Sequence, residues 1–224
     1  MHKKILVVVA HPDDEVLGCG GTMARHVNNR DKVHVVFMSN GVTSRMHVND
    51  KEIENRKRAA INASNVLGVV NSSIFLDFPD NRMDTVALLD IVQTLEQVIH
   101  KIGPEVVYTH HLGDLNIDHQ TTHKAVMTAC RSQPGLCVKE IYAFEVTSST
   151  EWQTPGVNPF CPNVFIDIAD YIDLKKKALK EYAKEMRQPP HSRSIDNLVH
   201  LNALRGNSVG VDYAEAFVLL RKIK

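Results

Sequence analysis

A dense group of ionisable side chains begins at residue 11, where His11, Asp13, Asp14 and Glu15 are interrupted by a single proline. His11 and Asp14 are three residues apart, so a turn or the first turn of a helix can direct both side chains towards one point. One imidazole and one carboxylate are two of the three protein ligands that a catalytic zinc site commonly uses. The simpler interpretation is a turn and helix cap, because Asp favours such positions.

A second, histidine-rich cluster lies near the middle of the chain. His110 and His111 are adjacent, and His119 and His123 follow them closely. Asp118 and His119 open a predicted helix that runs to residue 130, and the start of a helix is well suited to placing a ligand beside a reacting group. This cluster is therefore the expected source of the third metal ligand.

Short β-branched runs alternate with helical patterns over the first half of the sequence, and this alternation predicts an α/β fold. The expected architecture is a mostly parallel sheet with helices on both faces. The segment 11–21 between the first strand and the first helix is expected to be a loop. Strands are predicted over residues 4–10, 33–39, 73–76 and 105–109, and helices over 22–28, 51–67 and 85–100.

Both polar clusters follow predicted buried strands, the first after residues 4–10 and the second after residues 105–109. In parallel α/β sheets the ligand binds beyond the carboxyl ends of the strands. The two clusters are therefore expected at the same edge of the sheet, which weakens the interpretation of His11 and Asp14 as a cap alone.

From about residue 135 the pattern becomes less regular, but no linker divides the chain, so residues 1–224 are predicted to form one domain. A Ser/Thr/Pro-rich loop is expected over residues 147–162. The remaining predictions are short apolar runs at 141–144 and 164–168, helices over 170–187 and 195–204, and a last strand over 216–220.

The composition excludes several classes of function. Lys plus Arg equals Asp plus Glu at 26 each, so no basic surface for nucleic acid is indicated. The four cysteines form no CxxC pair, which argues against a disulfide framework or a cysteine-based zinc cluster. No apolar run reaches the roughly 18 residues of a membrane span, and the apolar start has no cleavage site for secretion. A cytoplasmic location is expected.

Several segments together resemble the PIG-L/LmbE-like family of zinc-dependent de-N-acetylases. The most specific of them is the first, which contains the sequence HPDDE, and its pairing with a later Asp-His makes chance agreement improbable. The matching segments are residues 10–21 (AHPDDEVLGCGG), 56–68 (RKRAAINASNVLG), 80–84 (DNRMD), 114–119 (DLNIDH) and 214–217 (AEAF).

The resemblance implies a Rossmann-like fold, one Zn²⁺ per subunit and removal of the acetyl group from N-acetylglucosamine-type amino sugars. By position in the motif, His11, Asp14 and His119 correspond to the zinc ligands, and Asp13 corresponds to the general base. The expected partner is a small N-acetylated sugar, free, nucleotide-linked or conjugated. Members of the family often form trimers or hexamers, so a homo-oligomer is implied.

This chemistry explains the residue types. Zinc lowers the pKa of its bound water to about 7, which makes hydroxide available at neutral pH. Asp13, next to a ligand but not itself one, can take the proton as the water attacks the amide carbonyl. Zinc then stabilises the negative oxygen of the tetrahedral intermediate, and acetate and a free amine result.

One position departs from the family pattern. Many members carry a histidine two residues before the Asp of the Asp-His pair, and this sequence has Asn116 there. An amide can donate a hydrogen bond to an oxyanion but cannot supply a proton at neutral pH. Either Asp13 performs both proton transfers, or His110 or His111 replaces the missing acid. Asp118 is a candidate for orienting a histidine ligand.

Further residues are candidates for contacting the substrate. Arg56 aligns with a substrate-contacting arginine of the family, and its alternative is a solvated charge on a helix. Asn81 and Asp84 follow the third strand and could bind sugar hydroxyls or simply form a turn. The complete candidate set is Arg56, Asn81, Asp84, His111, Asn116 and Asp118.

Two other functions remain open from the sequence. A zinc amidohydrolase acting on a non-sugar amide or a thiol conjugate would use the same metal ligands with a different pocket. A non-catalytic dinucleotide- or metal-binding module is the second alternative, although HPDDE replaces the glycine-rich phosphate loop and its acids would repel a pyrophosphate.

Overall fold

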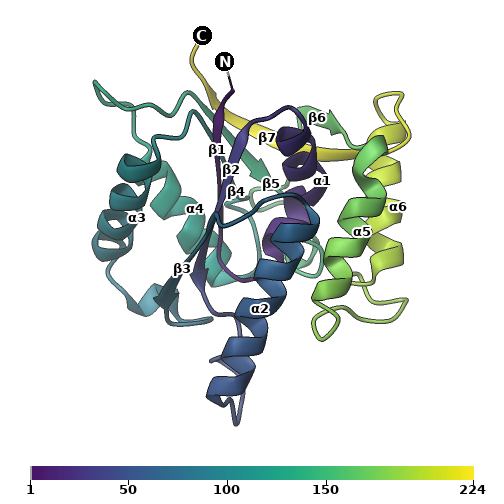
Figure 1. Ribbon diagram of the computed structural model, residues 1–224, viewed down its shortest axis with the longest axis horizontal. Coiled ribbons are helices and arrows are strands. Elements are labelled where there is room, and N and C mark those ends of the chain that lie inside the picture. Colours follow the sequence, from purple (N-terminus) through teal and green to yellow (C-terminus); the bar gives the residue numbers. More distant parts are fainter. Residues whose placement is uncertain (1) are drawn as a thin grey trace.

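The computed structural model describes residues 2–224 and contains one seven-stranded sheet with the order β3-β2-β1-β4-β5-β7-β6 (Figure 1). Neighbouring strands from β3 to β5 are parallel, and β7 runs antiparallel to both β5 and β6. The strands are β1 (Lys4–Val9), β2 (Lys32–Ser39), β3 (Ser73–Phe78), β4 (Val106–His110), β5 (Glu140–Phe144), β6 (Val164–Asp167) and β7 (Ala214–Lys222).

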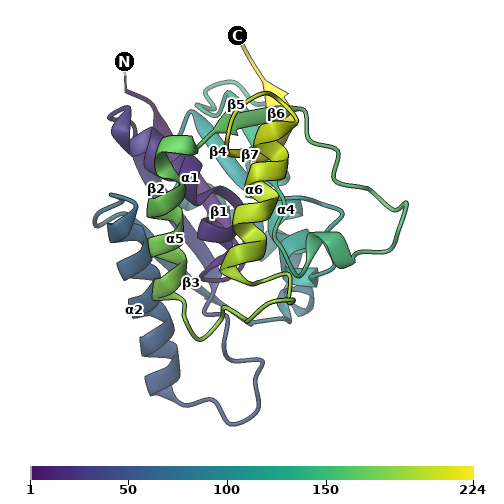
Figure 2. The same ribbon diagram turned by 90° about the vertical axis from the view of Figure 1, so that its right-hand side faces the viewer.

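Helices cover both faces of the sheet, with α3 and α4 on one side and α1, α2, α5 and α6 on the other (Figures 1 and 2). Among the residues described, none of these helices has the length and apolar character to cross a bilayer. The helices are α1 (Asp14–Asn28), α2 (Asp50–Val66), α3 (Leu88–Ile102), α4 (Ile117–Ala129), α5 (Ile172–Glu181) and α6 (Ile195–Asn207).

Strand β1 lies at the centre of the sheet and is buried on both faces. Ile5, Val7 and Val9 pack against α1 and α5, whereas Leu6 and Val8 pack against α3 and α4. Because successive side chains of a strand point to opposite faces, a continuous β-branched run is what such a central strand requires. The prediction of a mostly parallel α/β sheet covered on both faces is confirmed.

The prediction of a loop over residues 11–21 is wrong, because α1 already begins at Asp14. The glycines of this segment lower its helical propensity, but they allow close packing. A Cβ on Gly18 would come within 2.2 Å of the Phe144 ring, and one on Gly21 within 2.8 Å of Ile168. Tertiary packing therefore overrides local propensity in this segment.

Helix α1 is kinked at Cys19, whose φ of −146° and ψ of 24° are not helical. The backbone groups freed by the kink bind two buried charged side chains. Glu215 accepts hydrogen bonds from the amides of Gly21 and Thr22 at 2.9 and 2.7 Å, and Lys175 donates to the Leu17 carbonyl at 3.0 Å. The ammonium and the carboxylate also pair with each other at 2.7 Å. Residues of α5 and β7 thus hold the bent form of α1.

Two predicted helices differ at their boundaries. The helix predicted over 85–100 is α3, which begins only at Leu88 after a 3₁₀ turn over Met83–Thr85. The helix predicted over 170–187 is shorter, because the α-helix ends at Glu181 and turns follow. Charged residues continue past this end, so composition alone does not mark where the helix stops.

Candidate metal and active site

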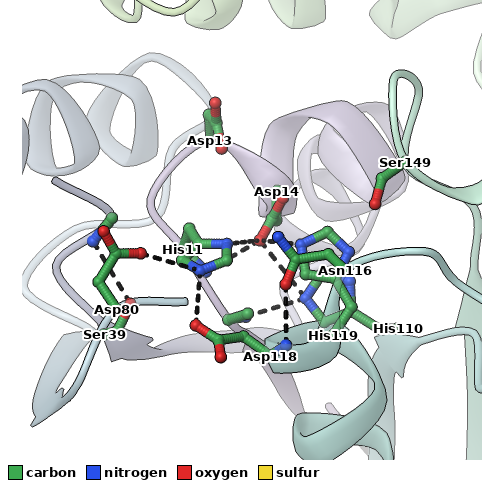
Figure 3. Close-up of polar contacts among 12 residues, drawn as sticks. His11, Asp13, Asp14, Ser39, Asp80, His110, Asn116, Asp118, His119 and Ser149 are labelled. Carbon is green, nitrogen blue, oxygen red and sulfur yellow. Dashed lines mark hydrogen bonds and ion pairs between the residues drawn. The ribbon is translucent and has the colours of Figure 1, made fainter. Parts of the chain in front are cut away.

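The polar clusters meet at the carboxyl edge of the sheet. The segment after β1 supplies His11, Asp13 and Asp14, the segment after β3 supplies Asp80, and the segment after β4 leads into α4 with His119. Figure 3 shows His11, Asp14 and His119 directed towards one another, with Asp13 on the side of Asp14 that faces away from Asp118. The expectation that two sequence-distant clusters share one sheet edge is confirmed for these side chains.

His11, Asp14 and His119 form a compact, buried group whose ligand atoms all lie within 4.8 Å of one another. Asp14 Oδ2 lies at its centre, 3.4 Å from His11 Nδ1 and 3.3 Å from His119 Nε2. The same oxygen accepts a hydrogen bond from the His11 amide at 2.9 Å, which fixes the turn between the two residues. The group offers two ring nitrogens and one carboxylate, the donor set of a catalytic zinc site.

The outer nitrogen of each histidine faces a carboxylate. His11 Nε2 lies 3.0 Å from Asp118 Oδ2 and 3.2 Å from Asp80 Oδ1, and His119 Nδ1 lies 3.1 Å from Asp114 Oδ1. Metal-binding histidines characteristically donate their other N–H to a carboxylate, because this fixes the tautomer and directs the free lone pair towards the metal. The inner nitrogens are the ones that face Asp14.

The carboxylates around the two histidines favour positive charge at this point. Burial lowers the pKa of His119, but Asp14 and Asp114 outweigh it and raise that pKa to about 9. Burial likewise opposes the charged form of His11, yet three carboxylates hold its pKa well above the ordinary value. The pKa of Asp14 is held well below its usual range by the histidines, against the effect of burial. A proton or a metal ion satisfies the same electrostatic demand, so the residues fit a bound cation.

A second grouping, His11 with Asp80 and Asp118, also brings three ligand atoms together. It uses the outer nitrogen of His11. Asp118 is already committed, because its oxygens accept hydrogen bonds from the amides of Asn81 at 2.6 Å and Met83 at 3.0 Å. This grouping is better explained as the support of His11 than as a metal site of its own.

Asp13 lies in a network of arginines. Its Oδ2 is 3.2 Å from both Arg56 Nη2 and Arg193 Nη1. Its backbone has a positive φ of 117°, and its amide donates to Glu15 Oε2 at 3.0 Å. Glu15 also accepts from the Tyr182 hydroxyl at 2.6 Å, and burial raises its pKa to about 8. Glu15 therefore supports the unusual backbone conformation that places Asp13 between the arginines.

His110 and His111 are both engaged elsewhere. The Ala10 amide donates to His110 Nε2 at 2.9 Å, and the ring is fully buried and stacked on His119 at 3.9 Å between centroids. Burial holds the pKa of His110 well below its usual value, so the ring is neutral. His111 Nε2 donates to the Asn158 carbonyl at 2.8 Å.

The remaining candidate residues differ in their surroundings. Asn116 caps α4 by accepting from the Asp118 amide at 2.8 Å, and its Nδ2 donates to Asn81 Oδ1 at 3.0 Å. Asn81 is exposed, and so is Asp84, for which no side-chain partner is found in residues 2–224. Arg56 is buried and also pairs with Glu185 at 2.7 Å, so it is not a solvated helix charge.

Asp80 and Asp114, which face the two histidines in the structure, were not among the candidate residues predicted from the sequence. Both lie in segments at the carboxyl edge, after β3 and β4. Like His11 and His119, they follow predicted buried strands, so their position at this edge could be predicted from the sequence. Arg193 and Tyr182 come from the irregular C-terminal part and had no such signal.

The fold and the site together define an α/β protein with a candidate mononuclear metal centre at the carboxyl edge of its sheet. Residues 6–130 match the family model PIG-L, described as GlcNAc-PI de-N-acetylase. The chain belongs to this family of deacetylases.

Two curated proteins and one solved structure are similar to the chain over most of its length. An uncharacterised deacetylase of Escherichia coli K12, YaiS, is 33% identical over 186 residues, which cover 80% of this chain and 90% of that protein. A 4-oxalmesaconate hydratase of Pseudomonas putida is 29% identical over 198 residues, covering 80% and 72%. The crystal structure of the conserved protein TT1542 from Thermus thermophilus superposes with a TM-score of 0.79 at 25% identity, covering 99% and 96%.

Proposed function

We propose that the protein is a zinc-dependent hydrolase that removes the acetyl group from an N-acetylglucosamine-type amino sugar. One observation carries the metal part of this proposal: both histidines turn one nitrogen towards Asp14 and the other towards a carboxylate. The acetyl-sugar part rests on the family, whose description names a GlcNAc substrate.

In this proposal His11, Asp14 and His119 hold the zinc ion, one per subunit. When bound, zinc supplies a Lewis acid and a water molecule whose pKa is near 7. Asp118 and Asp80 keep the proton of His11 on Nε2, and Asp114 keeps that of His119 on Nδ1. The inner nitrogens are thereby left as neutral donors, as a metal requires.

Asp13 acts as the general base. Both arginine contacts fall on Oδ2, and within residues 2–224 Oδ1 has no hydrogen-bond partner. Oδ1 is thus available to accept the proton of the attacking water and to return it to the leaving amine. Asp13 performs both transfers in this scheme, because the rings of His110 and His111 are engaged with backbone groups.

The substrate-binding candidates divide by exposure. Asn81 and Asn116, joined by their amides at the rim of the site, are proposed to contact sugar hydroxyls, and Asp84 is a more distant candidate. Arg56, which is buried, is proposed to hold the Asp13 carboxylate in place through their ion pair. For Asp118 and His111 we propose support of the site, since their polar atoms are occupied by protein partners.

Acetate release from a panel of N-acetylated sugars, sugar conjugates and non-sugar amides tests the proposal. The zinc-loaded protein should release acetate from at least one amino sugar, and Asp13→Asn should abolish the reaction while retaining zinc. Release from non-sugar amides alone would support the amidohydrolase alternative. No release from any compound by the zinc-loaded protein would refute the function.

Hydration is a second candidate, because one relative is a hydratase at 29% identity. Both reactions begin with a water molecule activated beside a metal, so the ligand group alone does not separate them. An unsaturated dicarboxylate losing its ultraviolet absorbance without release of acetate would favour hydration. Acetate release without that change would favour the deacetylase.

By resemblance to the family we also propose a homo-oligomer, a trimer or hexamer, and a cytoplasmic location. Light scattering coupled to gel filtration measures the assembly directly. A monomer at micromolar concentration would contradict the first part, and export of the tagged protein in its host would contradict the second.

A further inference from the structure

Five charged side chains form a series of contacts of alternating sign beside the metal group. In order they are Arg193, Asp13, Arg56, Glu185 and Arg45. Asp13 Oδ2 is 3.2 Å from each of its two arginines, and Glu185 lies 2.7 Å from Arg56 and 2.8 Å from Arg45. This series begins and ends with a guanidinium, so it contains three cations and two anions.

The surplus charge is placed where a ligand can reach it. Arg56 and Glu185, in the middle of this series, are buried. The side chain of Arg193, next to Asp13, is 22% exposed. Arg45, at the other end, is half exposed and belongs to the segment after β2. Arg193 is therefore the accessible guanidinium that adjoins the proposed catalytic base.

Arg193 is held in one orientation by two of its three nitrogens. Nε donates to Ser148 Oγ at 2.8 Å, and Nη1 donates to Asp13 Oδ2. Its backbone amide donates to His191 Nδ1 at 3.0 Å, which fixes the turn that presents the side chain. Nη2 has no partner within the described part of the chain. A guanidinium anchored in this way has N–H groups already positioned for an oxyanion, so little entropy is lost when one binds.

The metal group, in contrast, carries an excess of negative charge. Four carboxylates surround its two histidines, those of Asp14, Asp80, Asp114 and Asp118. Their combined negative charge exceeds the positive charge of one divalent ion. An anionic part of a substrate is therefore repelled at the metal end and attracted at the Arg193 end. A neutral acetamide has no such conflict at the metal.

We infer that Arg193 binds an oxyanion, a carboxylate or a phosphate, on a part of the substrate outside the acetamide. This inference rests on the proposed function and narrows its substrate class to N-acetylated amino sugars that carry an anionic substituent. Arg193 then orients the substrate, with the acetamide at the metal group and the anion at the guanidinium.

Steady-state kinetics on three matched compounds test this inference. They are N-acetylglucosamine glycosides whose aglycone is neutral, carries a carboxylate or carries a phosphate. The wild-type protein should prefer one of the anionic compounds in kcat/KM, and the preferred one identifies the oxyanion. Arg193→Gln should remove that preference through a KM increase of about 10- to 100-fold, the range for loss of a charge-assisted hydrogen bond, while affecting the neutral compound much less.

Two variants complete the design. Arg193→Lys keeps the charge and should retain part of the preference. Arg131→Gln is the matched control, because Arg131 pairs with Glu96 on the surface after α4, at the opposite edge of the sheet, and should leave all three rates unchanged. Circular dichroism of each variant checks folding.

An equal loss of kcat on all three compounds in Arg193→Gln would overturn the inference, since Arg193 would then only position Asp13. Absence of any anionic preference in the wild-type protein would overturn it as well. If the zinc-loaded protein turns over none of the compounds, the proposed function fails separately. Calorimetric binding of the same compounds to wild type and Arg193→Gln then decides the inference by the same preference.

Discussion

The two histidines of the metal group each have a different set of carboxylate partners, and this is what gives each ring nitrogen a distinct task. Within residues 2–224, Asp114 is the one carboxylate that faces the outer nitrogen of His119, whereas His11 faces both Asp118 and Asp80. Loss of one outer carboxylate should therefore be felt more strongly at His119 than at His11.

Asp114→Asn tests this arrangement. The amide cannot hold the proton of His119 as a carboxylate does, so zinc affinity should fall by about 10- to 100-fold. Competition titration with a chromophoric chelator measures the change. Asp90→Asn on the exposed side of α3 is the control and should bind zinc as the wild type does. Unchanged affinity in Asp114→Asn would show that Asp114 does not support a metal ligand.

Asp13→Asn separates catalysis from metal binding. Asp13 is not a member of the His–Asp–His group, so the variant should retain its zinc, as measured by atomic absorption. Turnover should fall by at least about 100-fold, the lower range for loss of general base catalysis. Retained activity would remove Asp13 from the proposed mechanism.

The pH dependence of metal binding follows from the raised pKa of His119. In the metal-free protein burial lowers this pKa, but Asp14 and Asp114 favour the imidazolium more strongly and raise it to about 9. Below pH 9 a proton must leave before a metal binds, so affinity should decrease by about tenfold per pH unit for each proton displaced. Chelator titrations between pH 6 and pH 9 measure the slope, and a flat profile would contradict it.

At the scale of the elements, the bent helix α1 links the metal site to the C-terminal part of the chain. Its first turn carries Asp14, and the buried Lys175–Glu215 pair binds the backbone groups freed at the kink. The aromatic ring of Phe144 packs against Gly18 and also contacts His110. The position of the first metal-binding segment thus depends on α5, β5 and β7.

Lys175→Met should be strongly destabilising. It leaves Glu215 buried without its cation and the Leu17 carbonyl without its donor, and breaking a buried pair from one side typically costs about 3–5 kcal/mol. Urea unfolding measures the change. Lys176→Met is the matched control, because Lys176 forms an exposed pair with Asp173, and its change should stay within about 0.5 kcal/mol. Equal effects of the two variants on the free energy of unfolding would show that the buried contacts of Lys175 contribute no more than an exposed ion pair.

The elements show how far sequence patterns reach. The strands after which the polar clusters follow are close to their predicted ranges because continuous apolar runs mark them, and helices α2 and α4 also lie close to their predicted ranges. The beginning of α1 was missed, since Gly18, Gly20 and Gly21 reduce helical propensity, and the residues that pack closely on Gly18 and Gly21, Phe144 and Ile168, are distant in sequence. Local patterns cannot report contacts of that kind.

At the scale of the whole molecule, the fold predicts which residues meet but not how they pair. The parallel order of β1 and β4 brings His11, Asp14 and His119 to one edge, and that much follows from the sequence. Which carboxylate faces which nitrogen depends on the paths of the loops after β3 and β4. Arg193 arrives from the segment before α6, more than a hundred residues from Asp13, and only the tertiary structure reveals that contact.

Anomalous diffraction at the zinc absorption edge, from crystals of the protein grown with zinc, would show directly whether His11, Asp14 and His119 bind the metal. A single strong peak should lie about 2.0–2.2 Å from His11 Nδ1, Asp14 Oδ2 and His119 Nε2, the distances of zinc to nitrogen and oxygen ligands. No peak at this group, or a peak bound instead through His11 Nε2, Asp80 and Asp118, would show that His11, Asp14 and His119 do not form the zinc site.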